Sequence, residues 1–332
     1  MKEIICKTSK LLAENDEWKV RYKKYLEEIF RNSGKESKGF RKPIGLSIYS
    51  TVSDRKKLKY YLRFNGQNVG LVFKKEEKIK LQILNGNSKN GIKDLKLNKD
   101  KPVDWYGQDA TYFRSFFKKL SEDTKTKSPE HTVESWLLKE FRKSNSQSKA
   151  LCYIQPVLLH GQFFQMPTPI KASTHAPEYE KQFGGGIDIL ARVVKKNGQR
   201  RLCVMEIKDE NTNSESQRKA MEQAVTYATF ISTLLSEDKE WWEFFSGHKQ
   251  KTGRSHLNKN NIDVVTIMPS TTEERETFEG EVEVDNTEIK LHCYSLYYDK
   301  NEFITNKRFI FSGSYPETLK PQTLSDIVVQ TK

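Results

Sequence analysis

Apolar and polar residues along the chain follow two periods, one typical of strands and one typical of helices. Runs rich in apolar and β-branched residues predict strands at 44–52, 58–64, 68–73, 79–84, 187–194, 201–208, 262–269, 289–298 and 308–311, of which 262–269 is nearly continuously apolar. Apolar residues three and four positions apart predict helices at 10–31, 111–120, 129–141, 217–235 and 237–245. The segment 151–166 fits one long strand or a hairpin broken at His160-Gly161, and 167–180, with three prolines, is expected to be a loop. Together these elements predict a mixed α/β fold.

The length of the chain and one polar segment predict two domains. A chain of 332 residues is long enough for about two domains, each with its own core. Residues 121–127 include no apolar side chain, which is typical of a linker. We therefore expect a basic α+β domain at 1–125 and a second domain at 126–332.

The composition points to a nucleic acid as the partner. The net charge of +13 and the pI near 9.3 favour a polyanion, either a nucleic acid or an anionic membrane. No apolar run is long enough to span a membrane and no signal peptide is evident, so we expect nucleic acid, with DNA first. The four cysteines and six histidines lack the spacing of a zinc site. Three of the cysteines lie in apolar strand-like runs, which favours reduced core residues in a cytoplasmic protein. A homodimer is left open.

Two basic segments are candidates for contacts with phosphates. The first lies in a predicted β-hairpin rich in tyrosine and contains Arg55, Lys56, Lys57 and Lys59. The second is a polar loop that contains Lys249, Lys251 and Arg254. Lysine and arginine in such segments can bind phosphates while tyrosines stack on bases. Lysine is equally common on the outer face of a solvated hairpin, so both interpretations stay open for the first segment.

The strands predicted at 187–194 and 201–208 carry ionisable residues among their apolar ones. Side chains alternate between the two faces of a strand, so Glu206 and Lys208 point to the same side. An antiparallel pairing, joined by the turn that ends in Asn197-Gly198, brings Asp188 to that side as well. Carboxylates in so apolar a setting are costly unless something pairs with them. One lysine cannot neutralise two carboxylates, whereas a divalent cation can.

This pattern resembles a known nuclease motif. An isolated E-x-K tripeptide is most simply an ion pair on a solvated strand. Preceded by Asp188 after a glycine-rich turn, it resembles the PD-(D/E)xK nuclease superfamily. Glu206-Ile207-Lys208 matches the (D/E)xK element, and Gly186-Ile187-Asp188 stands in place of the Pro-Asp, without its proline. The spacing of Gln223 and Tyr227 matches the Q-x-x-x-Y element that follows E-x-K in the RecB-like branch.

The resemblance implies a fold and a set of ligands. It implies a restriction-endonuclease-like αβββαβ core with a mixed central sheet, at about 129–269. It implies that Mg²⁺ or Mn²⁺ is bound by Asp188, Glu206, the carbonyl of Ile207, and Glu134 on the helix before the first strand. Glu134 can equally be a glutamate at the edge of an apolar face whose head reaches water. Gln223 and Tyr227 would support this site.

The expected function is that of a Mg²⁺-dependent nuclease, in the first instance a DNA endonuclease. Its catalytic residues would be Asp188, Glu206, Lys208 and Glu134. Lys208 can activate water or stabilise charge on the phosphate, and we favour charge stabilisation because two neighbouring carboxylates oppose the lowered pKa that a base needs. The alternative is a non-catalytic nucleic-acid-binding protein that keeps a nuclease-like fold.

Overall fold

The structure, a computed structural model, describes residues 1–31, 46–52, 58–84, 95, 97, 101–120, 129–142, 154–172, 176–195, 199–209, 216–247, 257–271, 279–285, 287–306 and 309–315. It is a mixed α/β protein, as the sequence predicts. Its helices are α1 (Lys2–Ala13), α2 (Glu17–Arg31), α4 (Gln108–Lys119), α5 (Pro129–Phe141), α6 (Gln217–Glu237), α7 (Glu240–Ser246) and α8 (Lys300–Asn306). Within these ranges, none of the helices has the length and apolar composition that a membrane crossing requires.

The chain folds into two compact units whose boundaries differ from the division expected at residue 125. The main unit comprises Met1–Lys23, Leu137–Val157 and Met166–Lys332, and the basic unit comprises Lys24–Trp136 and Leu158–Gln165. The sequence of the basic unit holds 25 Lys and Arg against 14 Asp and Glu, a net charge of +11. The main unit holds 32 against 30, a net charge of +2. Nearly all of the excess positive charge therefore belongs to one unit.

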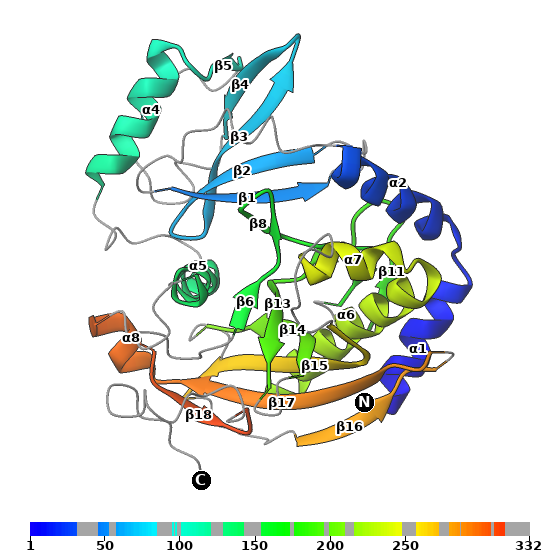
Figure 1. Cartoon of the computed structure of the whole chain (residues 1–332). Helices are drawn as coiled ribbons and strands as arrows, with labels where there is room; N and C mark the ends of the chain where they lie inside the picture. Colours follow the sequence, from blue (N-terminus) through cyan, green and yellow to red (C-terminus); the bar gives the residue numbers. More distant parts are fainter. Residues whose placement is uncertain are drawn as a thin grey trace. The chain divides into compact units, whose positions relative to one another are not determined.

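The basic unit is built on a seven-stranded sheet with the order β5-β4-β3-β2-β1-β8-β7 (Figure 1). Its strands are β1 (Ser47–Val52), β2 (Leu58–Phe64), β3 (Gln67–Lys75), β4 (Lys78–Ile83), β5 (Val103–Asp104), β7 (Leu158–Leu159) and β8 (Gln162–Phe164). Asn65 and Gly66 between β2 and β3 have φ of 44° and 79°, as a tight Asn-Gly hairpin turn requires. Phe117 of α4 packs on the sheet with its ring 5.4 Å from that of Phe64. The four strands expected between residues 44 and 84 are all present.

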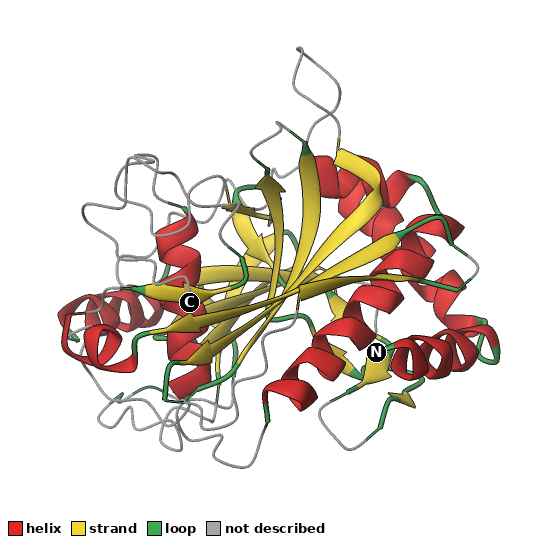
Figure 2. Ribbon diagram, turned by 90° about the horizontal axis from the view of Figure 1, so that it is seen from below, coloured by secondary structure: helices red, strands yellow, loops and turns green. Residues whose placement is uncertain are grey.

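The main unit contains a second sheet, with the order β16-β17-β15-β14-β13-β6 and β18 paired to β17. Its strands are β6 (Ile154–Pro156), β13 (Ile189–Val194), β14 (Arg200–Ile207), β15 (Leu257–Pro269), β16 (Glu279–Glu283), β17 (Lys290–Tyr298) and β18 (Phe311–Gly313). β6, β13 and β14 are antiparallel neighbours, whereas β15 runs parallel to β14 and β17 parallel to β15. A parallel neighbour needs a crossover connection, and α6 lies in the one between β14 and β15. The strands are twisted relative to one another (Figure 2).

α6 packs on strands β14, β15 and β17 of this sheet, and α1 packs in turn on α6 (Figure 1). The hydroxyl of Ser216 caps the start of α6 by accepting a hydrogen bond from the Lys219 amide at 3.3 Å. Ala220, Ala224 and Ala228 are fully buried, and their small side chains allow α6 to lie close to its neighbours. The helix predicted at 217–235 is thus present.

The single helix expected at 10–31 is in fact two helices, α1 and α2. The Asn15 amide donates to the Leu11 carbonyl at 2.8 Å, and the Trp18 indole donates to the Leu12 carbonyl at 3.0 Å. These side chains satisfy carbonyls that the end of α1 leaves without helical partners. Because apolar residues recur at helical spacing on both sides of the break, the periodicity did not reveal it.

Two other expectations are refined. The segment at 151–166 contains a hairpin, because β7 and β8 pair across His160 and Gly161, which have φ of 51° and 80°. The expected loop at 167–180 contains short strands instead: β9 (Pro167–Thr168), β10 (Ile170–Lys171) and β11 (Glu178–Tyr179). β10 pairs with β11, and β9 pairs with β12 (Gly185–Gly186). Strands of two residues carry no periodicity, so the sequence could not predict them.

Candidate active site

The register of β13 and β14 brings the two predicted carboxylates to facing positions. Ile189 pairs with Met205 at the end of the antiparallel ladder. Asp188 directly precedes Ile189 and Glu206 directly follows Met205, so the same register sets the two acids opposite each other. The Ile207 amide also donates a hydrogen bond to Oδ2 of Asp188 at 2.9 Å. This bond fixes the Asp188 carboxylate beside the end of β14.

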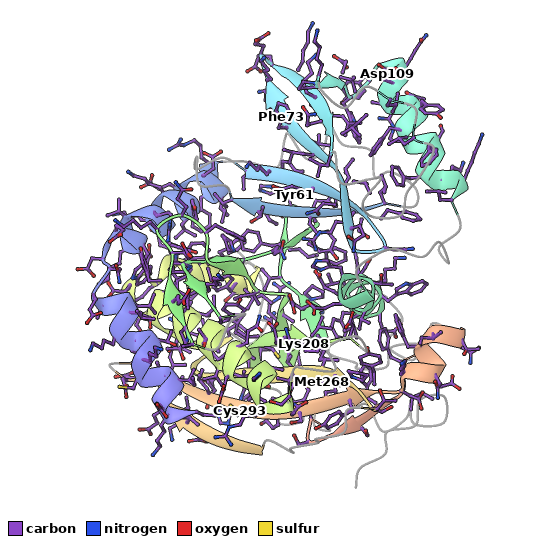
Figure 3. The ribbon with its side chains drawn as sticks, turned by 180° about the vertical axis from the view of Figure 1, so that it is seen from behind. Tyr61, Phe73, Asp109, Lys208, Met268 and Cys293 are labelled. Carbon is purple, nitrogen blue, oxygen red and sulfur yellow. The ribbon has the colours of Figure 1, made fainter. Side chains whose placement is uncertain are left out.

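Glu206 and Lys208 form an ion pair that is buried. Lys208 Nζ lies 2.8 Å from Glu206 Oε1. Only 1% of Glu206 and 4% of Lys208 is exposed, and Figure 3 marks Lys208 among the side chains of the interior. An ion pair on a solvated strand, the simplest interpretation of the E-x-K tripeptide, therefore does not describe this one. Removal of both charges from water is costly, so the pair needs further polar support.

Part of that support comes from α6. Lys208 Nζ donates to Gln223 Oε1 at 3.2 Å, and Gln223 Nε2 donates to the Tyr227 hydroxyl at 3.4 Å. A spacing of four residues sets Gln223 and Tyr227 on one face of the helix. Burial raises the pKa of the Tyr227 phenol, and the negative charges of Glu206 and Asp188 raise it further. The structure thus brings together five of the residues that the sequence singled out.

The glycine-rich turn before Asp188 is seated against this group. A Cβ atom on Gly185 would lie 2.8 Å from the Tyr227 hydroxyl, closer than real Cβ contacts come. A Cβ atom on Gly184 would lie 2.4 Å from the carbonyl carbon of Ile170. Both positions therefore favour glycine, because a side chain would collide with the neighbouring atoms. The absence of a side chain at Gly185 allows the turn to lie directly against Tyr227.

The oxygen atoms at this place fit Mg²⁺ or Mn²⁺. Hard cations prefer carboxylate and carbonyl oxygens, and Mg²⁺ commonly binds through one or two carboxylates while it keeps several waters. Asp188 and Glu206 supply two carboxylates at this place, and the ammonium of Lys208 is paired with Glu206. The described ranges contain no group of three or more His, Cys, Asp or Glu that could hold a metal ion. The fit is therefore that of a site with two carboxylates.

Glu134, the further ligand that the resemblance implies, is engaged inside the basic unit. Arg63 Nη1 lies 3.1 Å from Glu134 Oε1, and His131 Nδ1 lies 3.4 Å from Oε2. The Arg63 guanidinium also stacks on the Tyr49 ring, 3.9 Å from its centroid. Glu134 is 1% exposed, so its head does not reach water. Its carboxylate is the counter-ion of Arg63 and ties α5 to β2, whereas Asp188 belongs to the main unit.

Of the basic residues expected to bind phosphates, one is described. Lys59 is half-buried on β2, where it pairs with Thr51 of β1. The others lie outside the described residues: Arg55, Lys56, Lys57, Lys249, Lys251 and Arg254.

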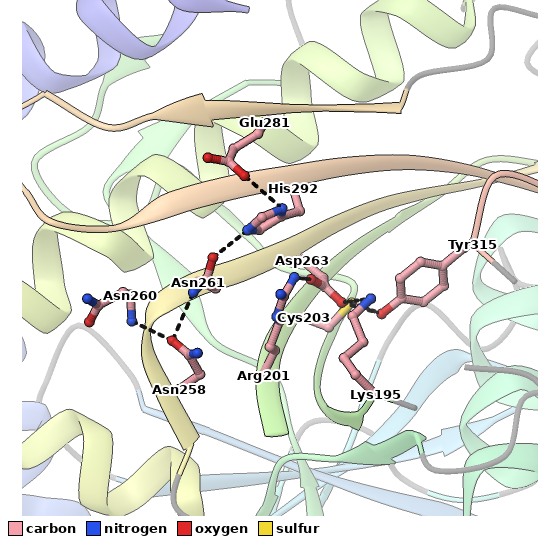
Figure 4. Close-up of polar contacts among 10 residues, drawn as sticks. All are labelled: Lys195, Arg201, Cys203, Asn258, Asn260, Asn261, Asp263, Glu281, His292 and Tyr315. Carbon is pink, nitrogen blue, oxygen red and sulfur yellow. Dashed lines mark hydrogen bonds and ion pairs between the residues drawn. The ribbon is translucent and has the colours of Figure 1, made fainter. Parts of the chain in front are cut away.

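A further buried carboxylate, not predicted from the sequence, is Asp263 on β15 (Figure 4). Lys195 Nζ lies 2.8 Å from its Oδ2, and Arg201 Nη1 lies 3.2 Å from its Oδ1. The Tyr315 hydroxyl donates to Oδ2 at 2.8 Å, and Lys195 Nζ lies 4.7 Å from the centroid of the Tyr315 ring. An acid inside the apolar run of β15 was the available signal, but its partners come from distant segments.

The Asp263 cluster, made of Asp263, Lys195, Arg201 and Tyr315, lies on the other face of the sheet from Glu206. Asp263 pairs with Cys203 in the parallel register, and Cys203 is three residues from Glu206, so the two point to opposite faces. Beside the cluster, His292 of β17 contacts Asn261 and lies 3.7 Å from Glu281 (Figure 4). Burial lowers the pKa of His292, and Arg201 acts in the same direction.

Comparison with protein-family models, with curated proteins and with solved structures gives no match. The chemistry of the site is therefore inferred from its own residues. These are two carboxylates, a buried lysine that one of them holds, and a glutamine and a tyrosine that support the lysine from a neighbouring helix.

Proposed function

We propose that the protein is a Mg²⁺-dependent nuclease that hydrolyses phosphodiester bonds, with DNA as the first candidate substrate and the cytoplasm as its location. The observation that carries this proposal is the buried group at the end of β14, in which Asp188, Glu206 and Lys208 meet Gln223 and Tyr227. The two carboxylates offer a site for a cation, and the lysine beside them offers a fixed positive charge. Metal-dependent phosphodiester hydrolysis uses both.

The order of the elements supports a restriction-endonuclease-like core. From α5 the chain runs through β6, β13, β14, α6 and β15, apart from the short strands β7 to β12 and the short helix α7 between α6 and β15. The first three of these sheet strands are antiparallel and β15 is parallel to β14, as an αβββαβ core with a mixed sheet requires. This agreement supports the proposal independently of the side chains.

In the proposed mechanism, Asp188, Glu206 and the Ile207 carbonyl would hold the cation. When bound, Mg²⁺ neutralises charge on the phosphate and lowers the pKa of a water. Glu134 is left out of this ligand set because its carboxylate is the counter-ion of Arg63.

Lys208 presents its ammonium to the phosphate. Two neighbouring carboxylates favour the charged form of the amine, which suits charge stabilisation better than general-base catalysis. Gln223 holds this ammonium from the side of α6 and so keeps it oriented before the substrate arrives. Tyr227 holds Gln223 in turn. These two are positioning residues, because they act on the reaction through Lys208.

The charge of the basic unit supports nucleic acid as the substrate. A net charge of +11 favours a polyanion, and binding that neutralises phosphates weakens steeply as salt rises. The second candidate is a non-catalytic nucleic-acid-binding protein with the same fold. It is favoured by the ion pair that engages Glu206 and by the lack of a third acidic ligand within the described ranges.

The deciding experiment incubates the purified chain with supercoiled circular DNA, linear DNA and RNA, with Mg²⁺, Mn²⁺ or EDTA. We expect cleavage of DNA with the metals and none with EDTA, and nicking of the circle identifies an endonuclease. Digestion of linear DNA alone identifies an exonuclease. Metal-independent binding of DNA without any cleavage would contradict the nuclease proposal and support the second candidate.

A further inference from the structure

An exposed phenylalanine stands at the edge of the candidate site. Phe183 is 62% exposed and directly precedes the glycine-rich turn. We propose that Phe183 stacks on an unpaired base of the substrate, so that the substrate is single-stranded or locally unpaired nucleic acid. This inference rests on the proposed function and adds to it the class of substrate and a residue that selects it.

The position of Phe183 relative to the site follows from the chain itself. Gly185 lies against the Tyr227 hydroxyl, and Phe183 is two residues away. Two residues span at most about 7 Å, so Phe183 lies within about one nucleotide step of the Tyr227 contact. A base stacked there belongs to a nucleotide at, or next to, the phosphate that faces Asp188 and Glu206.

The backbone around Phe183 is held in place from both sides. Before it, the amide of Glu180 donates to the carbonyl of Pro169 at 2.8 Å. After it, the amide of Gly184 donates to the carbonyl of Thr168 at 2.9 Å, and the amide of Ile187 donates to the carbonyl of Met166 at 3.0 Å. These bonds tie both ends of the turn to the β9–β10 segment.

The middle of the turn is held by an arginine of α2. The guanidinium of Arg21 donates to the carbonyl of Gln182 at 2.9 Å and to that of Lys181. Tyr22, the next residue, holds the opposite strand, because its hydroxyl donates to the carbonyl of Pro167 at 2.7 Å. A single exposed apolar side chain is ordinary on a protein surface. The turn that carries Phe183 is held at several points, so its backbone loses little conformational freedom on binding. This favours a role of Phe183 in recognition.

The chemistry around Phe183 favours a nucleobase as its occupant. Every base has an aromatic face, so an aromatic side chain binds bases without regard to sequence. Lys181, two residues away and exposed, supplies a positive charge for a neighbouring phosphate. A base inside a duplex is covered on both faces by its neighbours, so stacking on Phe183 favours an unpaired base, which needs no unstacking of a duplex.

The test measures binding in EDTA, so that nothing is cut. The probe is a single-stranded DNA of about 12 nucleotides that contains the fluorescent base 2-aminopurine, and titration of its signal gives the affinity of each variant. The wild type is compared with Phe183→Ala, Phe183→Leu and Phe183→Trp. The matched control is Ile304→Ala, which shortens another exposed apolar side chain of the main unit, 47% exposed.

Loss of one stacked base should weaken binding about 5- to 100-fold. We expect this loss for Phe183→Ala and Phe183→Leu, affinity near that of the wild type for Phe183→Trp, and no change for Ile304→Ala. A fully paired duplex should bind to all variants equally. Wild-type affinity of Phe183→Ala for the single strand would overturn the inference. Full affinity of Phe183→Leu would also overturn it, because an apolar contact without stacking would then suffice.

Cleavage separates this inference from the function on which it rests. If the wild type cuts DNA, Phe183→Ala should lose cleavage of single strands by the same factor as binding. If the wild type cuts nothing, the proposed function fails, while the fluorescence experiment still decides whether Phe183 stacks on a base.

Discussion

Two buried carboxylates on one sheet, Glu206 and Asp263, are neutralised in opposite ways. Asp263 faces two cations at 2.8 and 3.2 Å, from Lys195 and Arg201. Glu206 has one lysine at 2.8 Å, and a second carboxylate, Asp188, lies opposite it in the register. In the described part of the chain, two cations thus hold Asp263, whereas a second carboxylate lies beside the ion pair of Glu206.

This difference separates a structural ion cluster from a candidate cation site. An acid with an excess of cations attracts no further positive charge. A second acid beside a lysine–glutamate ion pair favours a bound cation, because the cation would reduce the repulsion between the two carboxylates. Burial is the main cause of the raised pKa of Tyr227, and the charges of Glu206 and Asp188 add to it. Burial alone would not have distinguished the two carboxylates, because both are almost completely buried.

The largest effect on cleavage is expected at Asp188 and Glu206. Asp188→Asn and Glu206→Gln should each reduce Mg²⁺-dependent cleavage at least about 10³-fold, because the cation contributes several kcal/mol and about 1.4 kcal/mol is tenfold in rate. Asp188→Asn should not lower stability, since it removes one of two neighbouring negative charges. Cleavage assays and thermal unfolding of the same samples check both points. Cleavage at the wild-type rate by Asp188→Asn would show that Asp188 does not bind a catalytic cation, and the contrast with the Asp263 cluster would then be lost.

The Asp263 cluster should respond in the reverse manner. Asp263→Asn leaves two cations without their counter-ion inside the protein, which should cost about 3–5 kcal/mol of unfolding free energy. Denaturant unfolding measures this loss. The control is Glu281→Gln, which removes a carboxylate with 45% side-chain exposure and should leave the midpoint near that of the wild type. Unchanged stability of Asp263→Asn would mean that the cluster does not hold the sheet.

Lys208→Ala tests the role of the lysine that is paired with Glu206. Removal of a charge-stabilising group typically lowers the rate about 10²–10³-fold, and we expect a loss of that size. The affinity for Mg²⁺ should persist or increase, because the ammonium competes with the metal for Glu206. Calorimetric titration of Mg²⁺ and a cleavage assay separate the two effects. A folded Lys208→Ala protein that cuts at the wild-type rate would reduce the lysine to a structural partner of Glu206.

The smallest effect concerns pH. His292 beside the Asp263 cluster has a pKa below its ordinary value of 6.5, because of burial first and the charges of Arg201 and Lys195 next, while Asp263 and Glu281 oppose the shift. The folded state favours neutral histidine, so this stability is present above about pH 6.5 and is lost as the pH falls. His292→Gln should therefore flatten the decline in unfolding free energy as the pH falls below about 6.5. An equally steep decline in the variant would assign the effect to other groups.

Much of the candidate site could be predicted because local patterns determine it. The alternation in β14 sets Glu206 and Lys208 on one face, and the four-residue spacing in α6 sets Gln223 beside Tyr227. Asp188 was also predictable, but it lies just before β13 rather than inside it. These elements follow from short-range periodicity, which the sequence displays directly.

The remaining features depend on residues far apart in the chain. Glu134 stood out as a carboxylate on an apolar face, but its partner Arg63 lies 71 positions away, and no spacing relates the two. Asp263 takes partners from segments near residues 195, 201 and 315, so its pairing was not predictable either. The sequence shows that a buried acid needs a partner, but only the fold decides whether that partner is a metal ion, a lysine or an arginine.

The packing of α1 on α6 sets an order of assembly during synthesis. About 200 residues separate the end of α1 from the start of α6, and the whole of Lys24–Trp136 lies between them. At about 5–20 residues per second, the ribosome needs roughly 10–40 s to make that stretch. Throughout that time the apolar face of α1, with Ile5 and Leu12, has no α6 to cover it. α1 therefore gains its cover from α6 only after the whole intervening stretch has been made.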